Sequence, residues 1–126
     1  MIKIDNDATI HYNRADNETI MLQANNGEYQ FLQGDIITFR IFLKNGYNQK
    51  AVLEKKIKLT EDAKQVNIEI TTDDITKFCN QINKPATYWY SISLNENVIL
   101  GYDEDGAKQF IIYPAKAEGD DENGNS

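Results

Sequence analysis

The chain has 126 residues, of which 40% are hydrophobic, and a formal net charge of −7 at pH 7. This length fits one domain that can bury a self-supporting core. The acidity argues against nucleic acid as a partner, because phosphate binding rests on clustered Lys and Arg. The N-terminus lacks the apolar stretch of a signal peptide, and no apolar run approaches the roughly 18 residues of a membrane span. We therefore expect a protein made inside the cell that does not insert into a membrane.

Alternating apolar and polar residues predict β-strands from the N-terminus onward. Extended segments are expected at residues 1–4, 8–13, 18–24 and 28–32. The clearest strand begins after Gly34-Asp35 and ends at Asn45-Gly46. Its inward row comprises Ile37, Phe39, Ile41 and Leu43.

The segment from Ala51 to Leu59 repeats this alternation with one break. Lys55 stands where an inward apolar residue is expected, which predicts a bulge or a position at a sheet edge. The next inward row comprises Val66, Ile68 and Ile70.

One segment has helical rather than strand spacing. Ile75, Phe78, Cys79 and Ile82 fall at positions i, i+3, i+4 and i+7. This spacing predicts a short crossover helix over about residues 72–82, with Thr72 or Asp73 as its N-cap.

The C-terminal part returns to alternation, and strands are expected at residues 88–94, 98–102 and 109–113. Residues 115–126 contain no apolar side chain larger than alanine and are expected to be a disordered acidic tail. We therefore predict one domain over residues 1–114. Short strands at intervals of about ten residues favour an all-β, antiparallel β-sandwich, with an open barrel as the alternative.

The residues predict no catalytic, cofactor or metal site. His11 is the sole histidine, lacks a second ligand nearby and is interpreted as an ordinary strand residue. Cys79 is the sole cysteine, and its sequence neighbours offer no cation, so we expect a free buried thiol. The loop from Gly101 to Ile112 resembles a calcium loop but lacks ligands at its first and twelfth places, which favours a polar turn.

The best candidate for contact with a partner is the run Tyr88–Tyr90 (YWY). If Tyr88 and Tyr90 point inward, Trp89 points outward beside Ser91 and Ser93. An outward Trp can stack on a sugar or anchor a protein, although a loop or the terminal segment can also cover it. The candidate contacts are Trp89, Tyr88, Tyr102 and Lys55.

Several segments resemble a family of small proteins and N-terminal domains from phages and prophages of Gram-positive bacteria, which includes the N-terminal domain of siphophage upper baseplate proteins. The resemblance covers about Gly27 to Tyr113. It is carried by residues 34–41 (GDIITFRI), 55–59 (KKIKL), 66–78 (VNIEITTDDITKF), 88–94 (YWYSISL) and 108–114 (KQFIIYP).

The resemblance implies an immunoglobulin-like β-sandwich that serves as a non-enzymatic building block of a phage tail or baseplate. It implies contacts with other phage structural proteins or with further copies of this chain, and a location in the bacterial cytoplasm and then in the particle. A carbohydrate-binding module that recognises cell-wall glycans through Trp89, Tyr88 and Tyr102 is the main alternative. A hydrolase with paired acids is a third hypothesis, for which no spacing singles out a pair.

Overall fold

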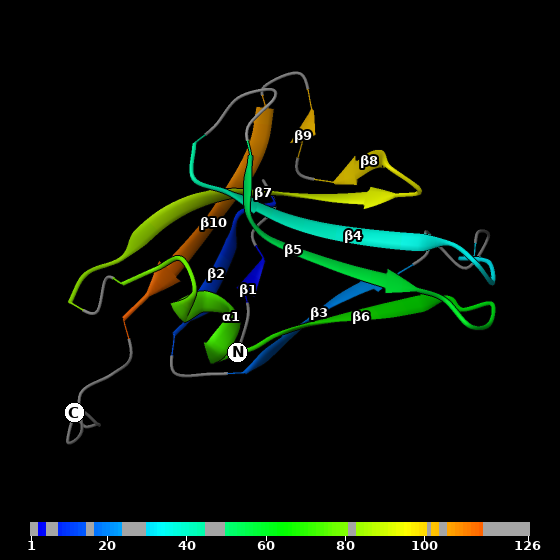
Figure 1. Ribbon diagram of the computed structural model, residues 1–126, viewed down its shortest axis with the longest axis horizontal. Coiled ribbons are helices and arrows are strands. Elements are labelled where there is room, and N and C mark those ends of the chain that lie inside the picture. Colours follow the sequence, from blue (N-terminus) through cyan, green and yellow to red (C-terminus); the bar gives the residue numbers. More distant parts are fainter. Residues whose placement is uncertain are drawn as a thin grey trace.

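The computed structural model of the chain describes residues 3–4, 8–14, 17–23, 30–44, 50–80, 83–100, 102–103 and 106–114. These residues are mostly β-structure, with one helix of a single turn (Figure 1). The elements are β1 (Lys3–Ile4), β2 (Ile10–Asn13), β3 (Glu18–Gln23), β4 (Ile36–Phe42), β5 (Ala51–Lys58), β6 (Gln65–Ile70), α1 (Thr72–Thr76), β7 (Ala86–Leu94), β8 (Asn97–Leu100), β9 (Tyr102–Asp103) and β10 (Gly106–Tyr113).

The larger sheet has the strand order β1-β2-β10-β7-β4-β5, and β8 and β9 extend it beside β7 and β10. Its neighbours are antiparallel except β2 and β10, which run parallel with Ile10 opposite Phe110. The expectation of a purely antiparallel arrangement is therefore wrong. Side-chain alternation assigns residues to faces, but it does not say which strands pair or in which direction.

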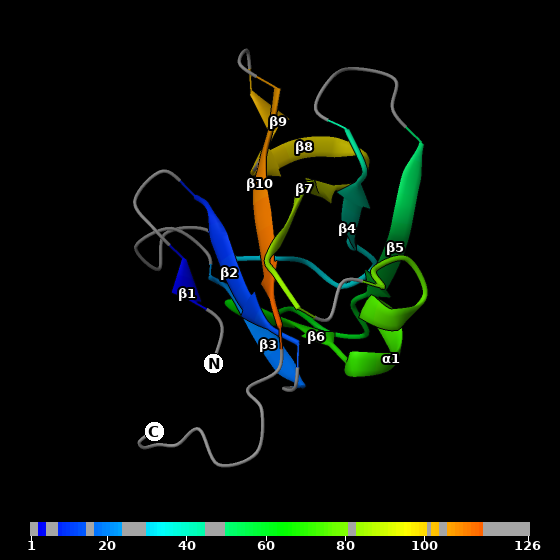
Figure 2. The ribbon, with the colours of Figure 1, turned by 90° about the vertical axis from the view of Figure 1, so that its left-hand side faces the viewer.

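The second sheet consists of β3 and β6, paired antiparallel with Ile20 opposite Ile68. It lies across from the larger sheet, with β3 on the side of β2 and β6 on the side of α1 (Figure 2). Inward residues of both sheets belong to one hydrophobic core, to which β3 and β6 contribute Ile20, Val66, Ile68 and Ile70.

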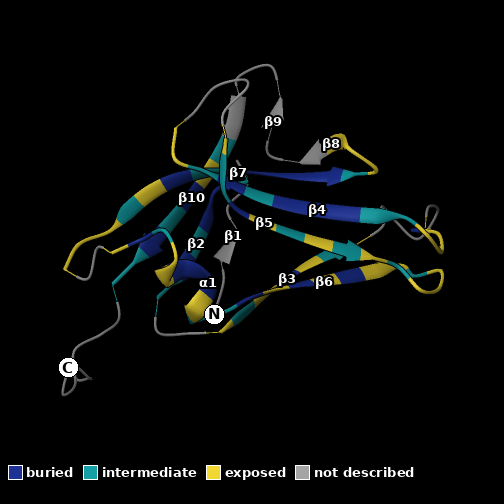
Figure 3. Ribbon diagram, in the orientation of Figure 1, coloured by how far each residue is buried: buried dark blue, intermediate teal, exposed yellow. Residues whose placement is uncertain are grey.

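Four aromatic rings form the centre of this core. Tyr12, Phe39, Tyr90 and Phe110 are fully buried. The Phe39 ring lies 5.9 Å from that of Tyr90 and 6.0 Å from that of Phe110. Buried residues dominate the central strands β4 and β7 (Figure 3). The inward positions predicted for Ile37, Phe39 and Ile41 are confirmed, whereas Leu43 follows the end of β4 and is exposed.

Gly34 forms the entry to β4. Its φ is +92°, and Asp35 N donates to Leu32 O at 2.9 Å, as in a type II turn with glycine at its third position. Leu59 bonds to both residues, because Gly34 N donates to Leu59 O and Leu59 N donates to Asp35 O, each at 2.9 Å. This is the pattern of a bulge with glycine as its first residue.

We predict that Gly34→Ala lowers the free energy of unfolding by about 1–2 kcal/mol, because an L-residue is strained at this φ. No atom lies within 4 Å of the added Cβ, so steric overlap adds nothing to this cost. Urea denaturation of both proteins measures the change. Gln33→Ala, one residue earlier in the same turn, is the control, and an equal loss in both variants would contradict the explanation.

Helix α1 begins at Thr72 as predicted but is shorter, and its N-cap is Thr71 rather than Thr72 or Asp73. Thr71 is the N-cap, since its hydroxyl accepts from Asp74 N at 3.2 Å while Asp74 Oδ2 accepts from Thr71 N at 3.0 Å. After Thr76 the chain turns, and Cys79 N still reaches Ile75 O at 2.9 Å. The spacing of Ile75, Phe78 and Cys79 is therefore met by one helical turn and a following turn, without a longer helix.

Two other expectations have different outcomes. Lys55 lies in a strand at the edge of the larger sheet, as expected, but the register of β4 and β5 is irregular only between Ile41 and Phe42, so there is no bulge at Lys55. The turn at Asn45-Gly46 and the tail at residues 115–126 lie outside the described residues.

Candidate interaction surface

Trp89 lies on the outer face of the larger sheet and is half-buried. Its neighbours across the ladders are Phe42 on β4 and Gln109 on β10. Phe39 and Ile41 point inward, so the alternation of β4 places Phe42 on the same outer face as Trp89. This part of the outer face therefore combines two large aromatic side chains with a polar neighbour.

The rest of this outer face is less accessible than expected. Ser91 and Ser93, expected beside an exposed Trp89, are buried, as is Thr38, which lies opposite Ser93. Among the described residues, the Thr38 hydroxyl has no hydrogen-bond partner. Arg40 lies opposite Ser91 on the same face and extends toward the turn after β7.

Arg40 joins three segments through two ion pairs. Its Nε lies 2.7 Å from Glu54 Oε2 on β5, and its Nη2 lies 3.0 Å from Glu96 Oε1 in the turn between β7 and β8. Partial burial acts to lower the pKa of Arg40, but the hydrogen bonds that Arg40 donates to Glu54 and Glu96, together with their negative charges, outweigh it and raise the pKa. The bond from Arg40 in turn lowers the pKa of Glu54. Arg40 thus holds β4, β5 and the β7–β8 turn together.

Asn95 ties the same turn to the start of β4. Asn95 and Glu96 have φ values of 50° and 70°, the left-handed pair that a tight hairpin turn requires. Asn95 Oδ1 accepts from Ile36 N at 2.9 Å, and Asn95 Nδ2 donates to Asp35 Oδ1 at 3.1 Å. The bond from Leu32 N and the bond from Asn95 lower the pKa of Asp35.

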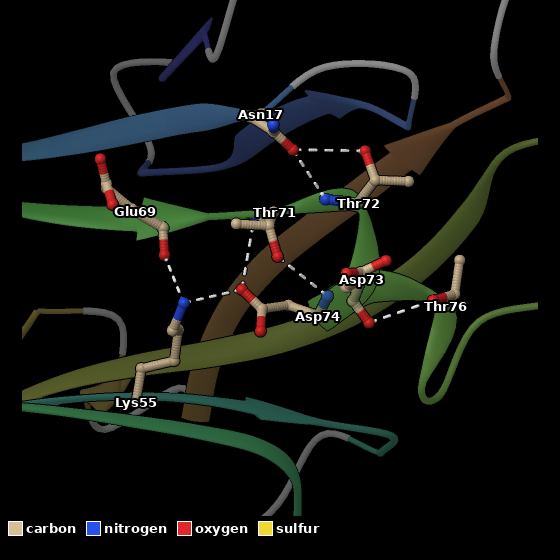
Figure 4. A network of polar contacts seen from close by, with 8 residues as sticks. All are labelled: Asn17, Lys55, Glu69, Thr71, Thr72, Asp73, Asp74 and Thr76. Carbon is tan, nitrogen blue, oxygen red and sulfur yellow. Dashed lines mark hydrogen bonds and ion pairs between the residues drawn. The ribbon is translucent and has the colours of Figure 1, made fainter.

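Lys55 points toward the inside of the protein, where it connects the edges of the two sheets (Figure 4). It lies opposite the inward residue Phe39, and its Nζ donates to Glu69 O on β6 and to Asp74 Oδ2 in α1, each at 2.7 Å. The same carboxylate takes part in the capping box with Thr71. We call Lys55, Glu69 and Asp74 the Lys55 bridge.

The Lys55 bridge is largely shielded from solvent, with exposed side-chain fractions of 28% for Lys55 and 12% for Asp74. Burial acts to raise the pKa of Asp74, but the hydrogen bonds from Lys55 and Thr71 outweigh it and lower the pKa below 3.8. The ammonium predicted as a partner contact is thus engaged inside the protein. A docking role for Lys55 stays a prediction.

The start of α1 is also tied to the segment before β3. Thr72 N donates to Asn17 Oδ1 at 3.0 Å, and the Thr72 hydroxyl lies 3.4 Å from the same oxygen (Figure 4). The crossover between the sheets is therefore fixed from two sides, by Asn17 and by Lys55.

Tyr88, predicted as a contact residue, is buried and only 7% exposed. Its ring meets Phe78 edge-on at 5.0 Å between centroids. Burial, followed by the interaction with the Cys79 thiol, raises the pKa of Tyr88 to about 12. Alternation along β7 turns this ring into the core, which is the inward position considered for Tyr88 in the sequence, and a contact role for Tyr88 stays a prediction.

The fold surrounds the remaining candidates with partners that sequence neighbours did not reveal. Cys79 is free and buried, as predicted, but Arg14 Nη1 donates to its Sγ at 3.4 Å. His11 lies in β2, with Nδ1 2.8 Å from the Tyr113 hydroxyl and the two rings stacked. The Tyr102 side chain lies outside the described residues, as do Gly101, Glu104 and Asp105 of the loop from Gly101 to Ile112.

Two of the open grooves that border β5 adjoin Lys55 and the Gly34 turn. One, of about 340 Å³, lies between the β5 and β6 edges and is lined by Lys55, Ile57, Asn67, Ile68 and Glu69. The other, of about 590 Å³, adjoins the Gly34 turn and is lined by Gln33, Gly34, Lys58, Leu59 and Thr60. Neither groove brings two carboxylates together.

In the part of the chain that the structure describes, no group of three or more His, Cys, Asp or Glu residues is arranged to hold a metal ion. Nor do the described residues include a helix of sufficient length and apolarity to cross a bilayer. No protein-family model, curated protein or solved structure matches the chain. The resemblance to phage proteins therefore enters only the proposals below.

Sequence reasoning missed Arg40, Glu96 and Asn95 as organisers of the surface. Arg40 and Glu96 are 56 residues apart, and Asn95 and Asp35 are 60 apart, so no local spacing pairs them. The Asn-Glu-Asn turn was itself a usable signal, because asparagine tolerates the positive φ of hairpin turns.

Proposed function

We propose that this chain is a non-enzymatic structural module of a phage or prophage particle, a tail or baseplate component that acts through protein–protein contacts. The observation that carries the proposal is that charged side chains of the described residues connect distant segments of the fold. Arg40, Lys55 and Asp35 each tie separate segments of the fold together. A domain whose segments are connected in this way suits a structural subunit that must keep its shape while its surface binds neighbouring subunits.

We also propose that the fold is an immunoglobulin-like β-sandwich. The strand arrangement supports this assignment, because β5-β4-β7-β10 form one sheet and β3-β6 the other. These correspond to strands C′-C-F-G and B-E of a variable-type immunoglobulin domain. In this scheme α1 lies on the crossover from β6 to β7, between strands E and F.

The assignment to a phage particle rests on the sequence resemblance. Two of its segments have defined roles in the fold, since Gly34-Asp35 builds the bulge before β4 and Thr71 with Asp74 caps α1. We propose that the chain is made in the bacterial cytoplasm and incorporated into the particle, where its partners are other structural proteins and further copies of itself.

Fractionation of an induced lysogen that encodes this chain tests the proposal. Particles are banded on a density gradient, and the chain is quantified by mass spectrometry in the particle band and in the free protein fraction. We expect it in the particle band at a fixed ratio to the tail proteins. Particles that form normally without this chain in the band would overturn the proposal.

Binding of cell-wall glycan is the second candidate function, favoured by the outward, half-buried position of Trp89. The chain has a single tryptophan, so intrinsic fluorescence reports this position alone. If the surface binds glycan, titration with cell-wall polysaccharide will give a saturable spectral shift, and Phe42→Ala will weaken it because Phe42 lies beside Trp89. A flat titration up to millimolar sugar would exclude the glycan function.

A further inference from the structure

The open edges of this fold are not equivalent. On the side of β5 and β6, the Lys55 bridge joins the two sheets, and the Lys55 ammonium donates a hydrogen bond to the Glu69 carbonyl oxygen on β6. Strand β5 also carries exposed Lys56 and Lys58. An inward-pointing charge and lysines along an edge are devices that discourage pairing with another chain.

Strand β3 carries no lysine, and its only charge is Glu18, its first residue. In the described residues it pairs only with β6, through six consecutive residue pairs without a register shift. Its residues from Thr19 to Gln23 carry no charge and include no proline. Met21 is outward-facing and 56% exposed. A regular edge without charge from Thr19 to Gln23 is a template for strand addition.

The Lys55 bridge also indicates which backbone groups of β3 face the open edge. Lys55 reaches Glu69 O from the β5 side, so the Glu69 peptide groups point away from β3. Hydrogen-bonded and non-bonded pairs alternate along an antiparallel ladder, and Glu69 lies opposite Thr19. The backbone N–H and C=O groups of Thr19, Met21 and Gln23 therefore point to the open edge.

We propose that β3 pairs antiparallel with β3 of a second copy of this chain, about a two-fold axis at Met21. This inference rests on the proposed function, whose partner surface it specifies. In this register Met21 meets Met21 of the other copy, Thr19 meets Gln23, and inward Ile20 meets Leu22. On the outer face Thr19 meets a polar residue and Met21 meets its own copy, and on the inner face apolar residues meet apolar ones, so the strand is complementary to itself.

The pairing forms about six backbone hydrogen bonds, two at each bonded pair, and converts two two-stranded sheets into one of four strands. A six-residue strand buries less than the roughly 1,200 Å² of a standard interface. We therefore expect a dissociation constant in the roughly micromolar range, which repetition in an assembly would strengthen through avidity.

Sedimentation velocity over a concentration series tests the inference with Met21→Lys. Two ammonium groups then meet at the two-fold axis, and we expect the dissociation constant of the dimer to rise at least about tenfold. Leu43→Lys is the matched control, because Leu43 is also 56% exposed but lies outside β3. A wild-type chain that stays monomeric at millimolar concentration, or equal dimerisation of Met21→Lys and the wild type, would overturn the inference.

A cross-link gives a second readout that does not depend on weakening the dimer. Under mild oxidation Met21→Cys should form a covalent dimer, because bonded antiparallel residues lie about 5.5 Å apart between Cα atoms. Leu43→Cys should form far less. Equal cross-linking in both variants would contradict the register. If no dimer forms but the chain still bands with particles, this inference is wrong and the proposed function stands. If the chain dimerises but is absent from particles, the proposed function is wrong and the dimer stands.

Discussion

Replacing Phe39 with alanine is expected to lower the free energy of unfolding by about 3–5 kcal/mol, the largest effect of any single change considered for this chain. Phe39 is fully buried on the central strand β4 and contacts the rings of Tyr90 and Phe110. The cavity that Phe39→Ala would leave lies between the two sheets, where the paired strands limit how far the surrounding side chains can move in to fill it. Urea denaturation monitored by circular dichroism measures the loss.

Two companion variants make this result interpretable. Phe39→Leu retains most of the volume and should lose clearly less than Phe39→Ala, which keeps the prediction testable if the alanine variant does not fold. Leu43→Ala, on an exposed side chain just after β4, should change stability by about 0.5 kcal/mol or less. Similar losses at positions 39 and 43 would show that the core is not where the structure places it.

Lys55→Met is expected to lower the free energy of unfolding by about 1–2 kcal/mol at pH 7, because it leaves Asp74 and the Glu69 carbonyl without their donor. The partial exposure of Lys55 keeps the effect below that of a fully buried pair. Lys56→Met is the matched control, since the nearest acidic oxygens lie 3.9 Å from Lys56 Nζ. We expect it to change stability by about 0.5 kcal/mol or less.

The loss in Lys55→Met should depend on pH in a defined direction. The folded-state pKa of Asp74 is lowered below the ordinary 3.8, so its pairing with Lys55 contributes fully above that value. The contribution is lost as the pH falls through the folded pKa. The difference in stability between wild type and Lys55→Met should thus shrink in acid below pH 3.8 to the part contributed by the bond to the Glu69 carbonyl, whereas a constant difference from pH 7 to pH 2.5 would show that the ion pair contributes nothing to it.

The sequence predicted the faces of the strands well, because alternation with period two is local. The inward row of Ile37, Phe39 and Ile41 and the outward position of Trp89 both follow from it. The same rule placed Lys55 on the inward side, and the fold accepts a charge there because Asp74 and the Glu69 carbonyl come from elements later in the chain.

What alternation did not predict depends on contacts between distant segments. The parallel pairing of Ile10 with Phe110 joins the two ends of the domain. Ser91 and Ser93 are buried on the outer face, where Arg40 reaches across to Glu96. The capping exchange between Thr71 and Asp74 begins α1, which is a single turn. The apolar spacing in the sequence predicted a longer helix.

The candidate partner contacts likewise divide into features that local alternation predicts and features that depend on distant segments. Alternation places Trp89 on the outer face of β7, and the same alternation turns Tyr88, the candidate contact beside it, inward. The β3 edge could not be singled out from the sequence, because an uncharged stretch from Thr19 to Gln23 becomes distinctive only beside an edge such as β5, which carries lysines.

Residue-resolved amide hydrogen exchange by NMR, at low and high protein concentration, tests most directly the central claim that this is a braced module which docks through one open edge. The amides of Thr19, Met21 and Gln23 should exchange several-fold more slowly at high concentration. Those of Glu54, Lys56 and Lys58 provide the internal reference, since the bonds of Leu59 to Gly34 and Asp35 direct them, by alternation, to the open edge of β5. They should not change. Protection that is independent of concentration at β3, or that develops at β5 instead, would contradict the account.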